Sequence, residues 1–293
     1  MTADKECRVL VASDGSAQAT AAVETVARFP WHARTRMGVV IAQQHPREFR
    51  GVVSGPALEQ RANLIATAAR GVLSRRWPQV DVTMTHASAV AGILREAKKF
   101  DADVIVLGWR GHGAVRRLLM GSVSRGVVRG ATCATLIVRG RPRDVRRIVI
   151  GVDGSAHAQR AVALVGRLQP PRTGVVTMFT AVDQMGVPSH ALVGGGVRTA
   201  VAAEVRRINA ERVAQAKHAL AVAAETLRHA GWRVRTVVAA GAPLRGLLDA
   251  VGAANADLLV LGARGVDSVQ RLLLGSVAEG ALGRCRVPVL VVR

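Results

Sequence analysis

The 293-residue chain has no tyrosine, only 3% aromatic residues and three cysteines. So few aromatic rings argue against a platform on which single-stranded nucleic-acid bases stack. Cys7, Cys133 and Cys285 share no metal-ligand spacing, and an odd, sparse set argues against a disulfide framework. No apolar run reaches the roughly 18 residues that span a bilayer, and the N-terminus lacks a signal-peptide core. We therefore expect a cytoplasmic protein with no membrane partner.

Acidic residues are also scarce, since 20 of them face 41 lysines and arginines, which gives a formal net charge of +21. Such a surface attracts nucleic acids and other polyanions without specificity. The excess is almost all arginine and is spread along the chain rather than gathered in a tail. Arginine replacing lysine on solvated faces explains the same composition, and we expect no specific nucleic-acid partner.

The chain contains an internal sequence repeat, with one copy in each half. The segment "CRVLVASDGSAQATAAV" near the start resembles "RRIVIGVDGSAHAQRAV" in the middle, and Asp14 corresponds to Asp153. Later, "VLGWRG" matches "VLGARG" and "RLLMGSVS" matches "RLLLGSVA". The basic stretch with Pro142 between the copies is typical of a short linker. The repeat predicts two domains, residues 1–140 and 147–293, joined by a linker of residues 141–146.

Strands and helices are predicted to alternate in each copy. In the first half, apolar runs predict strands at residues 8–13, 37–43, 81–87, 103–108 and 134–138, with helices at 16–29, 57–77, 90–100 and from Ala114 to about Arg129. The continuously apolar strands are typical of a parallel sheet that is buried on both faces. The fold class is therefore α/β, with two similar doubly wound, Rossmann-like domains, each a five-stranded parallel sheet between helices.

Two polar features follow buried strands in each half. The first is the D-G-S turn that begins at Asp14 and Asp153. The second is the pattern G-x-x-G-x9-G-S, which starts at Gly108 and Gly262. Ligands of open parallel sheets bind beyond the carboxyl ends of the strands, at the switch point in strand order. Glycines there let backbone N–H groups converge on phosphates, and a helix start at Gly121-Ser122 favours an anion; the matching residues Arg117 and Arg271 would add positive charge.

Local structure offers competing explanations for these residues. The aspartates could simply cap helices, and the glycine stretch could be no more than a flexible turn. Asp103 and Asp257 precede the fourth strand of their halves, where a capping or loop role is preferred. No G-x-S-x-G, H-E-x-x-H or Walker motif is present, so we assign no catalytic residue and no protein metal site.

The D-G-S turns, the fourth strands "DADVIVLG" and "NADLLVLG", the G-x-x-G-x9-G-S stretches and the last strand "VPVLVV" together resemble the universal stress protein family in its tandem form. The resemblance covers nearly the whole chain, once per half. It implies a fold like that of the adenine nucleotide alpha hydrolases, and a regulatory protein of the stress response with one ATP site per domain, usually with a divalent ion such as Mg²⁺. It also implies that the last strands pair across a two-fold axis, here within one chain through "TLIVR" and "VLVVR". A homodimer, and a slow ATPase or phosphotransferase, stay as alternatives.

The resemblance implies roles residue by residue. Asp14 and Asp153 would contact the adenosine, with Ala12 and Gly151 beside them. Ala42 and Ala181 would line the adenine pocket, and Leu107 and Leu261 would flank the ribose. The residues that would hold the phosphates are Gly108, Gly111, Gly121, Ser122 and Val123 in the first half and Gly262, Gly265, Gly275, Ser276 and Val277 in the second.

Two residues depart from the family pattern. Trp109 is bulky where the family usually has a small residue, which would narrow the first site. Asp267 places a negative charge in the second glycine loop, which would weaken triphosphate binding there.

Overall fold

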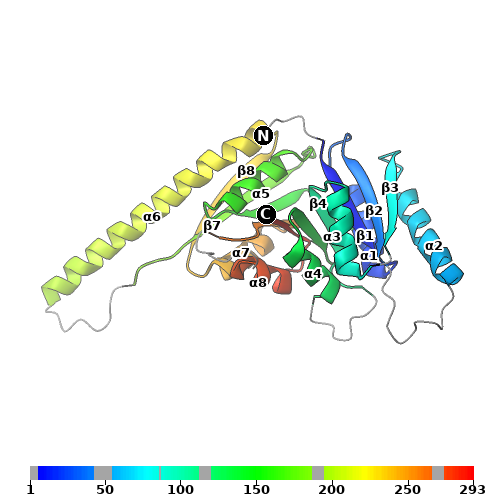
Figure 1. The fold of residues 1–293 in the computed structure, drawn as a ribbon. Helices are drawn as coiled ribbons and strands as arrows, with labels where there is room; N and C mark the ends of the chain where they lie inside the picture. Colours follow the sequence, from blue (N-terminus) through cyan, green and yellow to red (C-terminus); the bar gives the residue numbers. More distant parts are fainter. Residues whose placement is uncertain (1–5, 43–54, 86, 112–119, 187–194, 266–273) are drawn as a thin grey trace.

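The computed structural model describes residues 6–42, 55–85, 87–111, 120–186, 195–265 and 274–293. Two α/β halves follow each other along the chain (Figure 1). The elements of the first half are β1 (Arg8–Ser13), α1 (Ala17–Arg28), β2 (Arg36–Ala42), α2 (Gly55–Leu73), β3 (Val80–Thr85), α3 (Ala89–Lys99), β4 (Val104–Gly108), α4 (Ser122–Gly130) and β5 (Ala134–Val138). Those of the second are β6 (Arg147–Gly151), α5 (Ala156–Gly166), β7 (Val175–Val182), α6 (Gly195–His229), β8 (Arg233–Ala240), α7 (Pro243–Ala253), β9 (Leu258–Gly262), α8 (Ser276–Arg284) and β10 (Val289–Val292).

The strands form one ten-stranded sheet in the order β3-β2-β1-β4-β5-β10-β9-β6-β7-β8. Within each half all neighbouring strands are parallel, which confirms the predicted fold class. The halves meet where β5 and β10 pair antiparallel, with Leu136 opposite Leu290. We call this junction the seam, and it confirms the predicted pairing of the last strands.

The continuously apolar strands are explained by burial on both faces of the sheet. Val9 and Val11 of β1 belong to the core under α1, α2, α5 and α6, whereas Leu10 and Ala12 belong to the core under α3, α4, α7 and α8. Because successive side chains of a strand point to opposite faces, both sets must be apolar. Each core contains residues of both halves.

The start of α4 differs from the prediction, and the length of α6 differs from that of α2 in the first half. The helix predicted from Ala114 begins at Ser122, because Gly121 is extended (φ −59°, ψ 148°) and donates its N–H to the carbonyl of Trp109 at 3.0 Å. Residues 112–119 lie outside the described part of the chain. In the second half, α6 has 35 residues where α2 has 19, and its N-terminal part extends well beyond the sheet (Figure 1). This helix accounts for the predicted extra length of the second copy.

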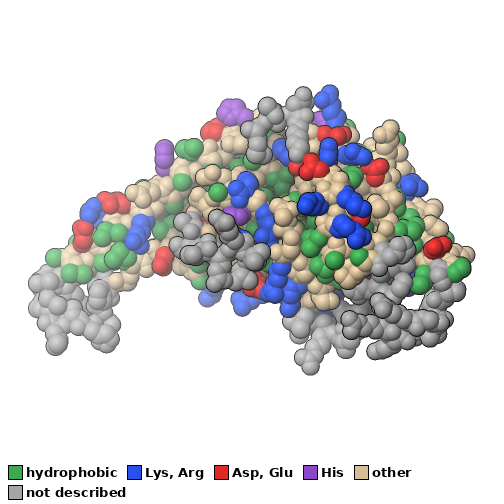
Figure 2. All heavy atoms as spheres, viewed as in Figure 1, with side chains coloured by type: hydrophobic (Ala, Val, Ile, Leu, Met, Phe, Trp, Pro, Cys, Tyr) green, Lys and Arg blue, Asp and Glu red, His purple; other side chains and the backbone are tan. Residues whose placement is uncertain are grey.

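Basic side chains are distributed over both halves on the face shown in Figure 2, as the scattered arginines of the sequence predict. None of the described helices combines the length and hydropathy that crossing a lipid bilayer requires.

Candidate functional site

The strand order creates one switch point in each half. β1 lies between β2 and β4, and β6 lies between β7 and β9, so the chain leaves the central strand in one direction and returns on its other side. Crevices open at the carboxyl ends of such strands. The D-G-S turn follows β1 or β6 directly, and the glycine stretch begins at the end of β4 or β9. Topology alone therefore brings the two predicted features of each half together.

The D-G-S turns are tight and alike. Gly15 and Gly154 have φ of +77° and +81°, a left-handed conformation that favours glycine. In the first turn, Oδ1 of Asp14 accepts the backbone N–H of Ser16 at 2.9 Å. In the second, Oδ1 of Asp153 accepts that of Ser155 at 3.0 Å. The first oxygen of each carboxylate thus shapes the turn.

Serine, rather than aspartate, caps the helix that follows each turn. Oγ of Ser16 accepts the N–H of Ala19 at 3.3 Å, and Oγ of Ser155 accepts that of Ala158 at 3.1 Å. A serine cap of this kind contributes about 1 kcal/mol. Capping alone therefore does not account for the aspartates.

The second carboxylate oxygen points at the glycine loop. A Cβ placed on Gly111 would lie 2.3 Å from Oδ2 of Asp14, and one placed on Gly265 would lie 2.7 Å from Oδ2 of Asp153. Real Cβ atoms do not approach an oxygen this closely, so any other residue at either position would push the aspartate side chain away from the loop. In both halves the structure brings the predicted aspartate and the second predicted glycine into contact.

Gly108 and Gly262 have a different local reason to be glycine. A Cβ on Gly108 would lie 2.7 Å from the carbonyl oxygen of Gln18, and one on Gly262 would lie 2.8 Å from Cβ of His157. These glycines let the last residue of β4 or β9 pack directly against α1 or α5. Helix packing therefore explains the missing side chain without any ligand.

Gly121 and Gly275 close the base of each loop. Their N–H groups donate to the carbonyls of Trp109, at 3.0 Å, and Ala263, at 2.8 Å. Each glycine is also the N-cap of a nine-residue helix, α4 or α8, and has no side chain with which to accept a hydrogen bond from the first turn. The first N–H groups of a helix have no intrahelical partner, so both helix starts can donate to an anion.

The predicted adenosine-side residues line the same end of the sheet, on the face that carries α3, α4, α7 and α8. Ala12, Ala42, Leu107 and Leu261 are buried there, and Ala181 packs against the same core half-buried. Val123 and Val277, which were predicted to hold phosphates, are half-buried against this core as well. A Cβ on Gly151 would lie 2.5 Å from Cδ2 of Leu261, so this glycine makes room for the leucine. Ser122 and Ser276 are exposed at the helix starts.

Trp109 makes the first site unlike the second. Two guanidinium groups stack over its ring system, with the central carbon of Arg110 4.1 Å and that of Arg139 3.5 Å from a ring centroid. Nε1 of Trp109 is buried and has no hydrogen-bond partner among the described residues. Burial lowers the pKa of Arg139, and Arg110 adds to this effect, but an arginine stays charged near neutral pH. The matching residue of the second half is Ala263, which is fully buried.

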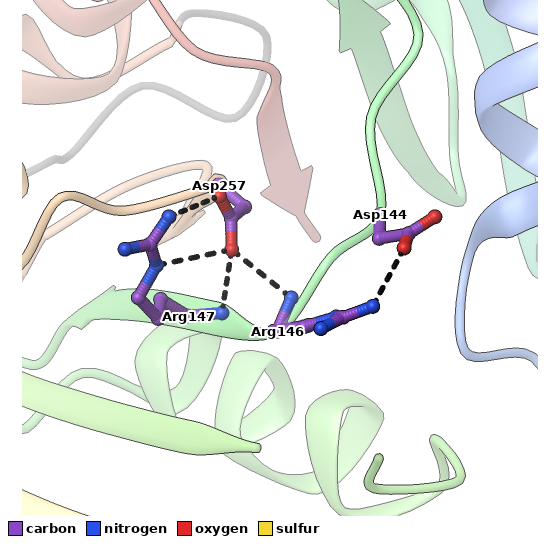
Figure 3. Close-up of polar contacts among 4 residues, drawn as sticks. All are labelled: Asp144, Arg146, Arg147 and Asp257. Carbon is purple, nitrogen blue, oxygen red and sulfur yellow. Dashed lines mark hydrogen bonds and ion pairs between the residues drawn. The ribbon is translucent and has the colours of Figure 1, made fainter. Parts of the chain in front are cut away.

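Asp103 and Asp257 lie at the opposite ends of the strands, as their predicted loop role requires. Oδ2 of Asp103 accepts the N–H of Arg8 at 2.9 Å. Oδ2 of Asp257 accepts the N–H groups of Arg146 and Arg147 at 3.1 and 2.9 Å, and the Arg147 guanidinium binds the same carboxylate (Figure 3). The two carboxylates tie β4 and β9 to the starts of β1 and β6, far from the crevices.

Several polar contacts at the sites were not predicted from the sequence. Oγ of Ser124, in the first turn of α4, donates to the carbonyl of Gly108 at 2.7 Å, and Oγ of Ser155 donates to that of Arg264 at 3.2 Å. A polar residue at an otherwise buried helix position was the only available signal for Ser124. Arg117, Arg271 and Asp267 lie outside the described residues. Within the described part, no three His, Cys, Asp or Glu residues are grouped as a metal site would need.

Comparison with known proteins agrees with this architecture. The model of the universal stress protein family matches residues 7–139 and again residues 144–293. Universal stress protein Rv2005c of Mycobacterium tuberculosis is 29% identical over 241 residues, which cover 79% of this chain and 75% of that relative. A universal stress protein of Mycolicibacterium smegmatis is 28% identical, with 98% of this chain and 97% of the relative aligned.

A solved universal stress protein of Archaeoglobus fulgidus has the same fold, with a TM-score of 0.64 at 19% identity over 98% of both chains. One of Pseudomonas aeruginosa has a TM-score of 0.59 at 13% identity and covers 99% of this chain and 94% of its own. The chain belongs to the universal stress protein family, with one match to the family model in each half.

Proposed function

We propose that this chain is a regulatory protein that binds ATP at two sites, one at each switch point. The observation that carries the proposal is the contact between the D-G-S turn and the glycine loop, seen twice as the close approach of Gly111 to Asp14 and of Gly265 to Asp153. The carboxylate suits the nucleoside end of a nucleotide, and the glycine loop suits its phosphate end. The carboxylate can accept hydrogen bonds from a hydroxyl or amino group, and the backbone can donate to phosphates.

The phosphates would bind at the starts of α4 and α8. The first-turn N–H groups there have no side-chain cap, and the partial positive charge of a helix N-terminus stabilises an anion. Gly121, Ser122 and Val123 would hold the phosphates in the first half, and Gly275, Ser276 and Val277 in the second. Gly108 and Gly262 would act indirectly, because they seat the loop against α1 and α5.

A divalent ion such as Mg²⁺ would arrive on the nucleotide. One aspartate of the D-G-S turn stands in each crevice, and its Oδ1 is already used to hold the turn. Mg²⁺ commonly keeps several waters and binds through substrate phosphates plus one or two carboxylates. The residues present therefore fit a nucleotide-borne ion better than a protein-built metal cage.

The experiment is to release small molecules from freshly purified protein for mass spectrometry, and to titrate nucleotide-free protein with ATP and Mg²⁺ by calorimetry. The wild type should bind two ATP per chain. Gly121→Val and Gly275→Val should each remove one site. A Cβ there already lies in contact, 3.2 Å from Cα of Arg110 or 3.4 Å from Cα of Arg264, and the two further methyl groups of valine need room beyond it. The double variant should bind none.

Gly283→Ala is the matched control. Gly283 lies in α8, and a Cβ there meets nothing within 4 Å, so both sites should remain. A wild-type protein without measurable affinity at millimolar ATP would refute the proposal. Measuring ADP release in the same samples tests the alternative of a slow ATPase or phosphotransferase, since true turnover must disappear in the double glycine variant.

A further inference from the structure

Arg139 and Arg293 directly follow β5 and β10, the two strands of the seam. They occupy matching positions in the two halves, at the ends of "TLIVR" and "VLVVR". Because β5 and β10 run antiparallel, each strand delivers its arginine to the opposite half. These two arginines are not among the residues that would touch a nucleotide.

We call α4 and α8 the cradle helices, because each starts at the glycine loop of its half. Each arginine binds the last carbonyls of the other half's cradle helix. Arg139 donates from Nη1 to the carbonyl of Cys285 at 2.6 Å and from Nη2 to that of Leu282 at 3.4 Å, at the end of α8. Arg293 donates from Nη2 to the carbonyls of Val128 and Arg129 at 2.8 and 2.9 Å, at the end of α4. A helix end leaves carbonyls without partners, and a cation there also offsets the negative end of the helix dipole.

The residue before each arginine holds the glycine loop of its own half. The carbonyl of Val138 accepts the N–H of Trp109 at 2.8 Å, and the carbonyl of Val292 accepts that of Ala263 at 2.7 Å. In the first half the loop also touches the arginine itself, through the stack of Trp109 on Arg139. A continuous path of contacts therefore runs from one loop, through the strand end and its arginine, to the helix that starts at the other crevice.

An ion pair also joins the two cradle helices directly. Arg129 near the end of α4 forms an ion pair with Glu279 in the first turn of α8, with Nη2 and Oε1 2.8 Å apart. Both side chains are about half-exposed, so this pair is a weak contact. The arginine–carbonyl contacts are the stronger link, because Arg139 and Arg293 are partly buried and each meets two carbonyls.

We propose that Arg139 and Arg293 are positioning residues that couple the two nucleotide sites, each setting the position of the cradle helix in the opposite half. The inference rests on the proposed ATP function and adds its regulation. An anion at the start of α8 and Arg139 at its end both stabilise α8. In the same way, an anion at the start of α4 and Arg293 at its end both stabilise α4. ATP held at one site fixes the strand end and arginine that position the helix of the other site, so the second ATP binds more tightly than the first.

Single-site backgrounds separate this role from a general loss of stability. Gly275→Val leaves only the first site, and Gly121→Val leaves only the second. Arg293→Lys keeps the positive charge but loses the planar fork that meets two carbonyls. In the first-site background it should weaken ATP binding about threefold to tenfold, although Arg293 belongs to the other half. In the second-site background it should change the affinity less than about twofold. Arg139→Lys should weaken ATP binding mainly in the second-site background. A smaller loss of affinity is also expected at the first site, because Arg139 stacks on Trp109.

The two-site protein provides the second measurement. Wild-type titrations should show positive cooperativity, and Arg139→Lys combined with Arg293→Lys should give two independent sites. Arg284→Lys, at an exposed arginine in the last turn of α8, should change neither affinity nor cooperativity. Independent wild-type sites, or an Arg293→Lys effect confined to its own half, would overturn the coupling while leaving ATP binding intact. A chain that binds no ATP in any background would refute the proposed function itself.

Discussion

His157 of the second half stands where the first half has Gln18, at the point where the end of the fourth strand meets the first helix. Burial lowers the pKa of His157, and the neighbouring charges of Arg160, Arg264 and Arg293 lower it further, while Asp153 opposes them. The structure therefore favours a neutral imidazole beside the second crevice. The same position in the first half carries no titratable group, so His157 is a second difference between the halves, and one that depends on pH.

His157→Gln should reduce the loss of stability between neutral pH and about pH 5. Because the folded-state pKa lies below the ordinary value of 6.5, the unfolded chain takes up the proton first as the pH falls. The stabilisation is complete above the ordinary value and is lost as the pH falls through the folded-state pKa. Urea unfolding at several pH values measures this directly. His218→Gln, on the exposed surface of α6, is the control, and an unchanged pH profile for His157→Gln would contradict the assignment.

At the scale of elements, the starts of β1 and β6 depend on carboxylates from the segments before β4 and β9. Asp257 is buried and receives two backbone N–H groups in addition to the Arg147 guanidinium (Figure 3). Nearby, Asp144 pairs with Arg146 at 2.9 Å, but both side chains are more than half-exposed. Two ion pairs within a few residues of each other should therefore differ greatly in their contribution to stability.

Asp257→Ala should lower the free energy of unfolding by about 2 kcal/mol, because it removes a buried carboxylate and leaves two partly buried backbone N–H groups without their acceptor. Asp144→Ala should cost no more than about 0.5 kcal/mol, as expected of an exposed pair. Chemical denaturation of both variants measures the difference. Since both carboxylates lie away from the crevices, ATP affinity should be unchanged in each. Equal losses of stability would show that burial does not decide the strength of these contacts.

At the scale of the whole molecule, the seam merges the two halves into one sheet. Leu136 and Leu290 face each other across β5 and β10, and both are fully buried. The helix-covered core on each face contains residues from both halves. Neither half can lose its structure without exposing part of the other's core, which favours a single cooperative unit.

Thermal unfolding followed by calorimetry should accordingly show one transition, with a calorimetric enthalpy close to the van't Hoff value. The buried seam gives the physical reason, since opening it leaves the edges of β5 and β10 unpaired. Saturating ATP should shift the single transition upward. Two separated transitions would show that the halves unfold independently despite their shared sheet.

Much of this architecture was predictable because it depends on local patterns. Short stretches of chain specify the apolar strands buried on both faces, the helix capped by Ser16 and the repeated D-G-S turn. The switch-point crevice follows from strand order, so the meeting of Asp14 with Gly111 was expected once the parallel sheet was assigned. The roles of individual residues toward ATP stay predictions, tested by the glycine variants.

The sequence by itself determined the two α/β halves, their strand-end crevices and the matching glycine stretches, because burial and turn conformation act over a few residues. Only the tertiary structure decided that Gly108 and Gly262 serve helix packing, that α4 begins after Gly121, and that Arg110 and Arg139 both stack on Trp109. It alone decided that Arg139 and Arg293 each cap a helix of the opposite half. Those contacts join residues more than 140 positions apart, and they exist only because the antiparallel seam places the end of each last strand beside its counterpart's helix.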